Sequence, residues 1–281
     1  MEAKRVAVVG AGSVGGVFAA HLSSVHDVVA CVRRRFDEYR IDSDEIPFRG
    51  PALAVTDIEQ LPWDGPADAV FVAVKSHHTE GAARWFEPLC GPDTVVVVMQ
   101  NGIEGRERLE PYVDGATVVP AVVYCGAELL EPGHIRHTSR SRLIVADDPA
   151  GERVRELCEA TPLQIDPSPN FTRSAWVKLG LNSVANGLTA LTGKPMEVIG
   201  EPGITDIARD LLTECWTLGR LEGAELDIDG IPQVLAGMAK GVGGRTSMLQ
   251  DREAGRPTEH DAIHGAVLRK GARHGVETPT T

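Results

Sequence analysis

The sequence predicts an α/β protein with an N-terminal Rossmann-type doubly wound sheet and an all-α C-terminal domain. Three observations support this prediction. A glycine-rich turn joins a strand pattern to a helix pattern near the start, buried-strand and helix patterns then alternate, and helical patterns alone follow residue 170. Residues 166–170 contain two prolines and helix-capping side chains, so we expect domains at residues 1–167 and 168–281 with the linker at this point.

A glycine-rich turn follows the first predicted strand, residues 4–9, and precedes helical spacing over residues 14–24. The turn reads Gly10-Ala11-Gly12-Ser13-Val14-Gly15. In this setting the first glycine allows a tight turn, the second lets the backbone approach a pyrophosphate, and the third lets helix and strand pack closely. These residues therefore predict a dinucleotide site with the phosphates at the helix N-terminus. A glycine-rich turn in some other α/β unit is the alternative.

The second predicted strand, residues 28–32, ends in Arg33-Arg34-Arg35 rather than in an acidic residue. An acidic side chain there would hold the ribose 2′-hydroxyl of NAD, whereas a guanidinium suits a 2′-phosphate. The sequence therefore favours NADP (NADPH) over NAD, with Arg33 on the phosphate. The alternative is a solvated basic loop that Asp37 and Glu38 partly neutralise.

Further strand ends point to the same ligand. Residues 69–74 and 94–99 are apolar enough to be buried strands, with a helical pattern over 79–89 between them. Ligands of parallel sheets bind beyond the carboxyl ends of the strands, so Lys75 and the Gln-Asn-Gly segment containing Asn101 should face the cofactor. A surface lysine and an ordinary Asn-Gly turn are the alternatives.

The rest of the chain supplies a hairpin and then helices. After a strand at residues 117–123, we expect strands at 134–138 and 142–146, near Pro132-Gly133, to extend the sheet of the first domain. Helical periodicity follows over residues 171–191, 204–222, 231–239 and 259–274.

The first helix of the second domain places Lys178, Asn182 and Asn186 four residues apart, on one polar ridge. The positions expected to face the core are Val177, Leu181, Val184, Leu188 and Leu191. Asparagine is a poor helix former, and the ridge lacks the glutamates and extra lysines of a plain solvated face. A functional ridge is therefore favoured over the wet side of a helix.

Two C-terminal segments, Thr-Ser-Met-Leu-Gln-Asp at 246–251 and Gly-Arg-Pro-Thr-Glu-His-Asp-Ala-Ile at 255–263, complete a set of motifs. With the glycine-rich turn, Val74-Lys75, Gln100-Asn101-Gly102 and Trp176-Val177-Lys178 followed by the two asparagines, they resemble the 2-dehydropantoate 2-reductases (ketopantoate reductases). The resemblance runs from the first turn to the last helix, and its C-terminal part is the specific one.

The resemblance implies that NADPH binds the first domain and that a 2-oxo acid enters the cleft between the domains. Lys178 matches the general acid, which would protonate the alkoxide formed by hydride transfer; burial is one way to tune its pKa for this role. Glu259 matches the carboxylate that receives the substrate hydroxyl, and Asn101 a residue between nicotinamide and substrate. The matches to substrate-binding positions are Asn182, Asn186 and Ser247.

Three histidines depart from the family pattern, which usually has asparagine at His264, glutamine at His78 and an aliphatic residue at His260. They could line an altered pocket, or they could be surface changes without effect. Relatives also generally continue beyond Thr281 through another helical segment. Substrate identity is therefore less firmly implied than the type of reaction.

Composition limits the partners. A net charge of −12 and a pI near 5.2 argue against nucleic acid or an anionic membrane. Five cysteines without CxxC spacing indicate reduced core thiols rather than disulfides, and no metal is expected. No apolar run approaches bilayer length, and we expect neither an export signal nor an anchor but a cytoplasmic enzyme. A homodimer is kept open.

The sequence thus predicts an NADPH-dependent reductase of a small 2-oxo acid, with ketopantoate as the leading substrate. One alternative is a reductase of another carbonyl or an imine on the same scaffold, in secondary metabolism. The other is a non-catalytic NADP-binding regulator, which would have no need for Lys178, Asn182 and Glu259 together. Hydrolase chemistry is disfavoured because the chain lacks a GxSxG elbow.

Overall fold

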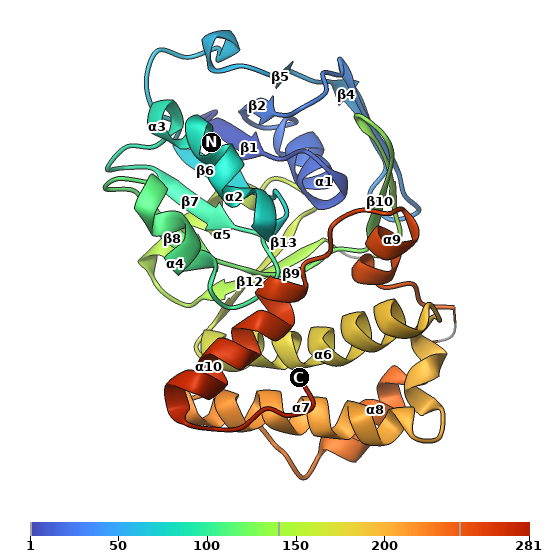
Figure 1. Cartoon of the computed structure of the whole chain (residues 1–281). Helices are drawn as coiled ribbons and strands as arrows, with labels where there is room; N and C mark the ends of the chain where they lie inside the picture. The colour runs from blue at the N-terminus through green and yellow to red at the C-terminus, as the bar shows by residue number, and fades with distance from the viewer. Residues whose placement is uncertain (1, 140, 242) are drawn as a thin grey trace. The chain divides into compact units, whose positions relative to one another are not determined.

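The computed structural model describes residues 2–139, 141–241 and 243–281, and contacts divide the chain into two units (Figure 1). The N-terminal unit contains the residues up to Gln100 together with Gly105–Phe171. The helical unit contains Thr172–Thr281 together with Asn101–Glu104. The four-residue segment Asn101–Glu104 therefore belongs with helices that follow it much later in the chain.

Six parallel strands form the central sheet of the N-terminal unit, in the order β5-β2-β1-β6-β7-β8. Their bounds are β1 (Arg5–Val9), β2 (Asp27–Cys31), β5 (Ala54–Val55), β6 (Ala69–Val72), β7 (Val95–Val98) and β8 (Thr117–Pro120). The chain winds outward from β1 through β2 on one side and from β6 through β7 on the other. The predicted doubly wound sheet is confirmed, with its switch point between β1 and β6, where such sheets bind ligands.

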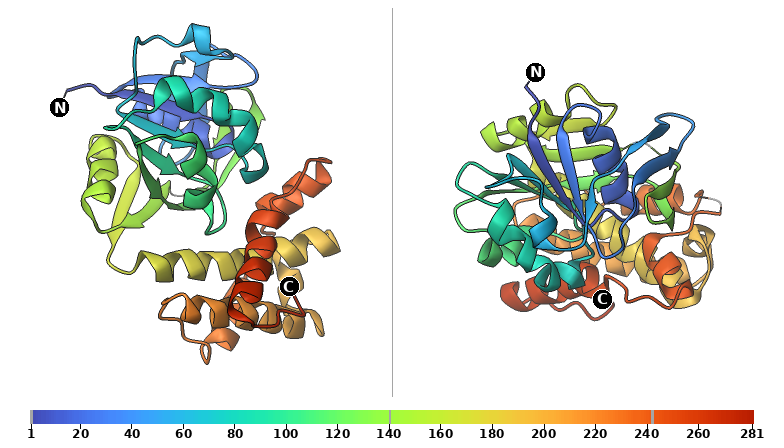
Figure 2. Two further views of the ribbon diagram at one scale, coloured as in Figure 1. Left: turned by 60° about the vertical axis from the view of Figure 1, so that its left-hand side comes forward. Right: turned by 90° about the horizontal axis from the view of Figure 1, so that it is seen from above.

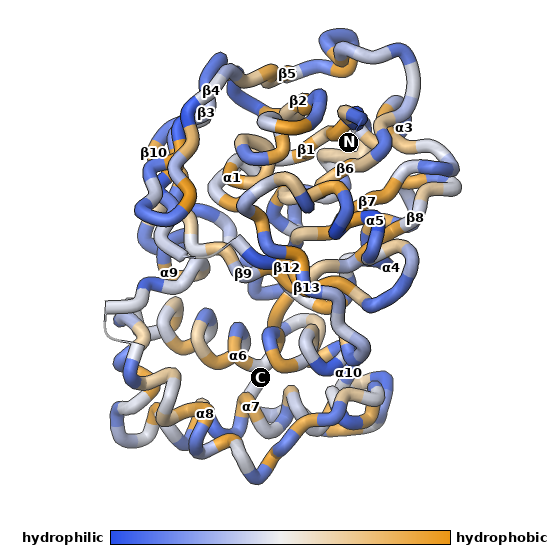
Figure 3. Tube along the Cα trace, turned by 180° about the vertical axis from the view of Figure 1, so that it is seen from behind, coloured by the Kyte–Doolittle hydropathy of each residue, from blue (hydrophilic) through white to orange (hydrophobic). Residues whose placement is uncertain are grey.

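Both faces of this sheet are covered, which explains why the buried positions of its strands are apolar (Figures 2 and 3). Val6 and Val8 of β1 share an apolar cluster with α1 (Ser13–Leu22) and α5 (Pro149–Cys158). Ala7 and Val9 belong to a second cluster, to which Trp85, Phe86 and Leu109 contribute. Successive side chains of β1 thus pack on opposite faces of the sheet, as the alternation of side chains along a strand requires.

The helix expected over residues 79–89 is broken into short pieces. The structure has α2 (Thr79–Ala82), a 3-10 turn (Ala83–Trp85) and α3 (Phe86–Leu89). Pro88 has no backbone N–H to donate to the carbonyl of Arg84, so a continuous α-helix cannot form across this point. A further short helix, α4 (Gly105–Leu109), follows β7.

The expectation that residues 134–146 extend the central sheet is wrong, because these residues build two smaller sheets. The hairpin at Pro132-Gly133 joins β10 (Ala127–Glu131) to β11 (His134–His137), which lie in a sheet of order β10-β11-β3-β4. The other members are β3 (Glu38–Asp42) and β4 (Phe48–Pro51). β11 pairs parallel with β3, a charged strand whose buried face consists of Tyr39 and Ile41.

The third sheet has the order β13-β12-β9, with β12 (Arg142–Ala146) between β9 (Val122–Tyr124) and β13 (Gln164–Ser168). The expected linker at residues 166–170 was therefore wrong for its first three residues, which are part of β13. Because β13 is an edge strand, it pairs on one side only, and such a strand tolerates a proline without a backbone N–H at position 167. The strand expected over residues 117–123 is likewise two strands, β8 and β9, in different sheets.

The helical unit contains five α-helices in its described residues, and its apolar core is separate from those of the N-terminal unit. They are α6 (Phe171–Thr192), α7 (Ile204–Leu221), α8 (Ile231–Met238), α9 (Ser247–Glu253) and α10 (Ala266–His274), with a π-helix (Asp261–Gly265) leading into α10. The helical pattern had not predicted α9. In the described part of the chain, no helix has the length and apolar composition needed to cross a membrane.

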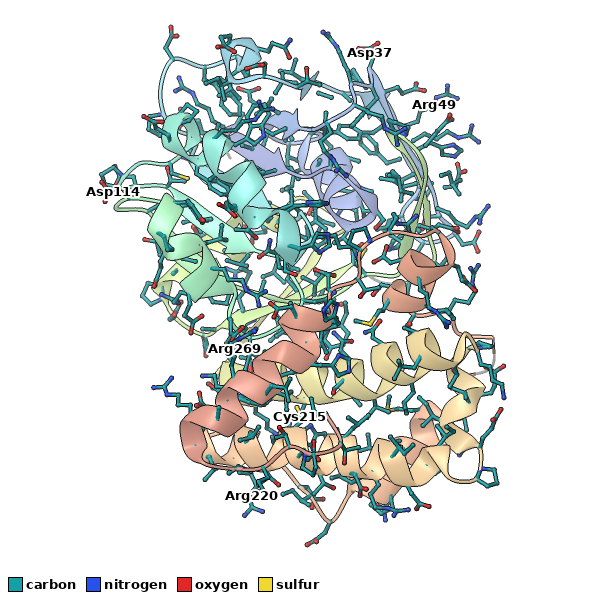
Figure 4. The ribbon with its side chains drawn as sticks, in the orientation of Figure 1. Asp37, Arg49, Asp114, Cys215, Arg220 and Arg269 are labelled. Atoms are coloured by element: carbon teal, nitrogen blue, oxygen red, sulfur yellow. The ribbon has the colours of Figure 1, made fainter. Side chains whose placement is uncertain are left out.

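All five cysteines lie in the described residues, and none of them is part of a disulfide there. Cys31, Cys158 and Cys215, the last labelled on α7 in Figure 4, are buried, whereas Cys90 and Cys125 are half-buried. Burial raises the pKa of the Cys31 and Cys158 thiols to about 12, so both stay protonated at neutral pH.

Candidate active site

The glycine-rich turn connects β1 to α1 at the switch point of the central sheet. Gly10 has φ of +96°, and a Cβ there would lie 2.7 Å from the backbone nitrogen of Val74, just beyond β6. A Cβ on Gly15 would lie 2.3 Å from the Gly10 carbonyl oxygen, whereas one on Gly12 would meet nothing within 4 Å. The backbone is therefore packed tightly on its protein side and open at Gly12, the N-cap residue of α1. This arrangement fits a pyrophosphate at the helix N-terminus, the site expected to involve Ala11, Ser13 and Val14 as well.

The arginine cluster after β2 is exposed, and its acidic neighbours pair with Arg35 and with Arg49. Asp37 lies 3.5 Å from Arg35. Glu38 accepts two hydrogen bonds, at 2.9 and 3.0 Å, from Arg49, which is labelled in Figure 4, and this pairing lowers the pKa of Glu38. Asp37 and Glu38, which could have neutralised part of the arginine cluster, therefore pair with Arg35 and Arg49. Arg33 lies two residues after the end of β2, at the carboxyl edge of the sheet, where a 2′-phosphate would be held.

Gln100 ties together the ends of two strands beside the turn. Its side-chain nitrogen donates to the Val74 carbonyl oxygen at 3.1 Å and to the Thr79 hydroxyl at 2.8 Å, and the residue is 8% exposed. These bonds hold the segment that contains half-buried Lys75. Sequence reasoning placed Gln100 at the cofactor edge but missed this role, because both partners follow a different strand.

In the helical unit, three predicted site residues from distant parts of the chain form one hydrogen-bonded series. Asn182 of α6 donates from Nδ2 to Oδ1 of Asn101 at 3.3 Å, and Asn101 donates from Nδ2 to Oε2 of Glu259 at 3.0 Å. Glu259 is 5% exposed. We call this set the Asn182–Asn101–Glu259 series. A buried carboxylate needs donors, and Asn101 supplies one.

Lys178 lies one helical turn before Asn182 on the same ridge of α6, and both residues are half-buried. Asn186, one turn later, is 4% exposed, so the ridge is not the wet side of the helix. Leu191, expected in the core, is instead 79% exposed, because it lies at the C-terminal end of α6 beyond the packed region.

Asn186 and Ser247 are in contact, and they also hold the start of α9. Asn186 Oδ1 accepts from the Ser247 hydroxyl at 3.3 Å and from the backbone N–H of Met248 at 3.1 Å. Thr246 caps the same helix, since its hydroxyl accepts from the N–H of Leu249 at 3.2 Å. The structure thus gives Asn186 a helix-anchoring role besides the substrate contact that the resemblance implies.

The three histidines that depart from the family pattern differ in environment. His264 packs its ring against Gly187 and has Nε2 3.0 Å from the Ser183 carbonyl oxygen of α6, and burial lowers its pKa. The neutral imidazole can donate this bond. His260 is exposed beside Thr258, while half-buried His78 packs edge-on against His77. His264 therefore joins the π-helix to α6, and this contact gives the histidine at position 264 a structural role.

Comparisons with known proteins follow the same division of the chain. The family model described as "Ketopantoate reductase PanE/ApbA" matches residues 6–149, and its C-terminal counterpart matches residues 170–281. A 2-dehydropantoate 2-reductase of Caulobacter vibrioides is 36% identical over 277 residues, 98% of this chain and 94% of that protein. One from Mycobacterium tuberculosis is 34% identical over 286 residues, covering 99% and 94%.

Among solved structures, a 2-dehydropantoate 2-reductase from Geobacter metallireducens superposes with a TM-score of 0.90 at 25% identity. The match covers 98% of this chain and 96% of that one. A PanE/ApbA family protein from Ralstonia eutropha gives a TM-score of 0.88 at 28% identity, covering 98% and 94%.

Proposed function

The chain belongs to the ketopantoate reductase family, and on that premise we propose that it catalyses the NADPH-dependent reduction of 2-dehydropantoate (ketopantoate) to pantoate. The observation that carries the proposal is the Asn182–Asn101–Glu259 series, one helical turn from Lys178. The helical unit thus contains the buried carboxylate of Glu259 and the ammonium group of Lys178. The proposed substrate uses both, the carboxylate for its distal hydroxyl and the ammonium group for its keto oxygen. The assembly state and the cellular compartment stay predictions from the sequence.

The chemistry divides simply between cofactor and protein. NADPH supplies the hydride when bound. The ammonium group of Lys178 stabilises the negative charge that develops on the keto oxygen and transfers a proton to it, so that this oxygen becomes a neutral hydroxyl group. Glu259 accepts a hydrogen bond from the distal hydroxyl, and Asn101 holds the other oxygen of that carboxylate. Asn182 orients Asn101, and Ser247 and Asn186 complete the proposed substrate contacts.

The residues of the N-terminal unit fit the proposed cofactor. Gly10 and Gly15 let the turn pack closely against the protein, Gly12 leaves its open side for the pyrophosphate, and the first turn of α1 faces that ligand. Arg33 is proposed to pair with the 2′-phosphate, since Asp37 and Glu38 are engaged by Arg35 and Arg49. Lys75 is proposed to contact the cofactor from the end of β6.

The function is tested by following NADPH absorbance with a panel of ketopantoate, 2-oxoisovalerate, other 2-oxo acids and cyclic imines. We expect the highest kcat/KM with ketopantoate. Activity confined to imines, or a higher kcat/KM with 2-oxoisovalerate, would contradict the proposed substrate. No NADPH oxidation with any compound, combined with tight NADPH binding, would favour the non-catalytic regulator.

Replacing Arg33 by Ala should weaken NADPH binding by about tenfold, because a charge-assisted hydrogen bond to phosphate is lost. NADH binding should change by less than about twofold, because NADH has no 2′-phosphate. Cofactor titration monitored by fluorescence measures both dissociation constants. Arg35→Ala is the matched control, since Arg35 is paired with Asp37. Equal weakening of both cofactors, or a wild type that prefers NADH, would contradict this assignment.

A further inference from the structure

The segment Asn101–Glu104 contacts the helical unit through each of its four residues. Asn101 donates to Glu259, and Ile103 packs against the apolar core of the unit. Gly102 has φ of +100°, and a Cβ there would lie 2.4 Å from the Ala262 carbonyl oxygen, so the two backbones touch. Glu104 accepts from Arg269 of α10. The segment is therefore fitted against the π-helix and its surroundings at every position.

Arg269, labelled in Figure 4, holds two carboxylates at once. Its Nε and one terminal nitrogen donate to the two oxygens of Glu104 at 3.0 and 2.6 Å. The other terminal nitrogen donates to the Asp261 carboxylate at 2.7 Å, and the terminal nitrogen that donates to Glu104 also donates to the Asp261 carbonyl oxygen at 3.0 Å. The hydrogen bonds that the guanidinium donates to Glu104 and Asp261 raise its pKa. We call Glu104, Arg269 and Asp261 the arginine clamp.

The clamp joins the two short segments that carry the contact between Asn101 and Glu259. Glu104 lies three residues after Asn101, and Asp261 lies two residues after Glu259, at the start of the π-helix. A planar guanidinium with bidentate partners fixes direction as well as distance, which a lysine cannot do. Exposed ion pairs contribute little to stability, and the Arg269 side chain is 46% exposed. The expected effect of the clamp is therefore on geometry.

We propose that the arginine clamp is a positioning device that aligns Asn101 with Glu259 and thereby sets the preference for a 2-oxo acid with a distal hydroxyl. The inference rests on the proposed function. Asn101 donates to one oxygen of the carboxylate to which the proposed function assigns the substrate hydroxyl, so the orientation of this carboxylate bears on substrate choice. Without the clamp, both segments gain freedom, and the carboxylate is less often in the orientation that accepts this hydrogen bond.

The test compares wild type, Glu104→Gln, Arg269→Met and Arg269→Lys in the full chain, with kcat and KM measured for ketopantoate and for 2-oxoisovalerate at saturating NADPH. In Glu104→Gln and Arg269→Met we expect the KM for ketopantoate to rise about fivefold, the size of one lost hydrogen bond. The KM for 2-oxoisovalerate should change by less than about twofold, because that acid has no hydroxyl for Glu259. Arg269→Lys should restore only part of the preference.

Arg273→Met, on the exposed surface of the same helix, is the matched control and should behave as wild type. Thermal unfolding of each variant separates a lost fold from a changed preference, and Glu104→Gln is the milder variant if Arg269→Met does not fold. Equal losses on both acids, or an unchanged ratio, would overturn the inference while leaving the proposed function intact. A wild type inactive on ketopantoate would overturn the proposed function, and the inference with it.

Discussion

Replacing Lys178 by Ala is expected to lower kcat for ketopantoate by about 10²- to 10⁴-fold, the usual contribution of a general acid. The reason is that no proton donor would remain at this point of the α6 ridge to neutralise the developing alkoxide. Binding of NADPH should be retained, because the glycine-rich turn and Arg33 belong to the other unit. Steady-state NADPH oxidation measures the first effect and cofactor titration the second.

Lys240→Ala is a suitable control, since it removes an exposed lysine of the helical unit that lies after α8. Far-ultraviolet circular dichroism and thermal unfolding should show the same fold in both variants. If Lys178→Ala turns over ketopantoate at a rate near that of wild type, Lys178 is not the general acid.

The central sheet and the helical unit could be predicted from the sequence because their signals are local. The strand before Gly10 is apolar from Val6 to Val9, since α1 and the opposite layer cover both of its faces, and α6 has a sustained helical period. Both features can be read within a short window. The glycine positions then follow from the close approach between strand end and helix start.

The smaller sheets could not be predicted, because their pairing joins segments far apart in the chain. β3 is charged at Glu38, Arg40 and Asp42, and its partner β11 begins 92 residues after the last of these. Neither segment has the apolar run of a central strand. The break between α2 and α3 was detectable from Pro88, which lacks a donor for the Arg84 carbonyl oxygen, whereas the exposure of Leu191 depends on where the packing of α6 ends.

The candidate site shows the same difference between local and distant signals. The spacing of Lys178, Asn182 and Asn186 predicted one ridge from helix geometry alone. The bond between Asn101 and Glu259 spans 158 residues, and only the resemblance to a family placed both at one site beforehand. The arginine clamp had no sequence signal, because Glu104 and Arg269 are 165 residues apart and ordinary surface residue types.

The chemistry of Glu259 determines how a substrate hydroxyl is recognised. The residue is buried, so an ionised carboxylate there needs hydrogen-bond donors, and Asn101 provides one. A substrate hydroxyl would provide another. An analogue without the hydroxyl does not donate this hydrogen bond to the Glu259 carboxylate. A site built around a polar contact rejects an analogue in this way.

Replacing Glu259 by Gln should lower kcat/KM for ketopantoate by about 10- to 100-fold, because the hydrogen bond from the hydroxyl is no longer assisted by a charge. The value for 2-oxoisovalerate should fall by less than about threefold, since this acid makes no such bond. The measurement is the ratio of the two specificity constants, with Glu277→Gln at an exposed position as the control. A parallel loss on both acids would mean that Glu259 serves the fold of the helical unit. An unchanged ratio would mean that the hydroxyl is held elsewhere.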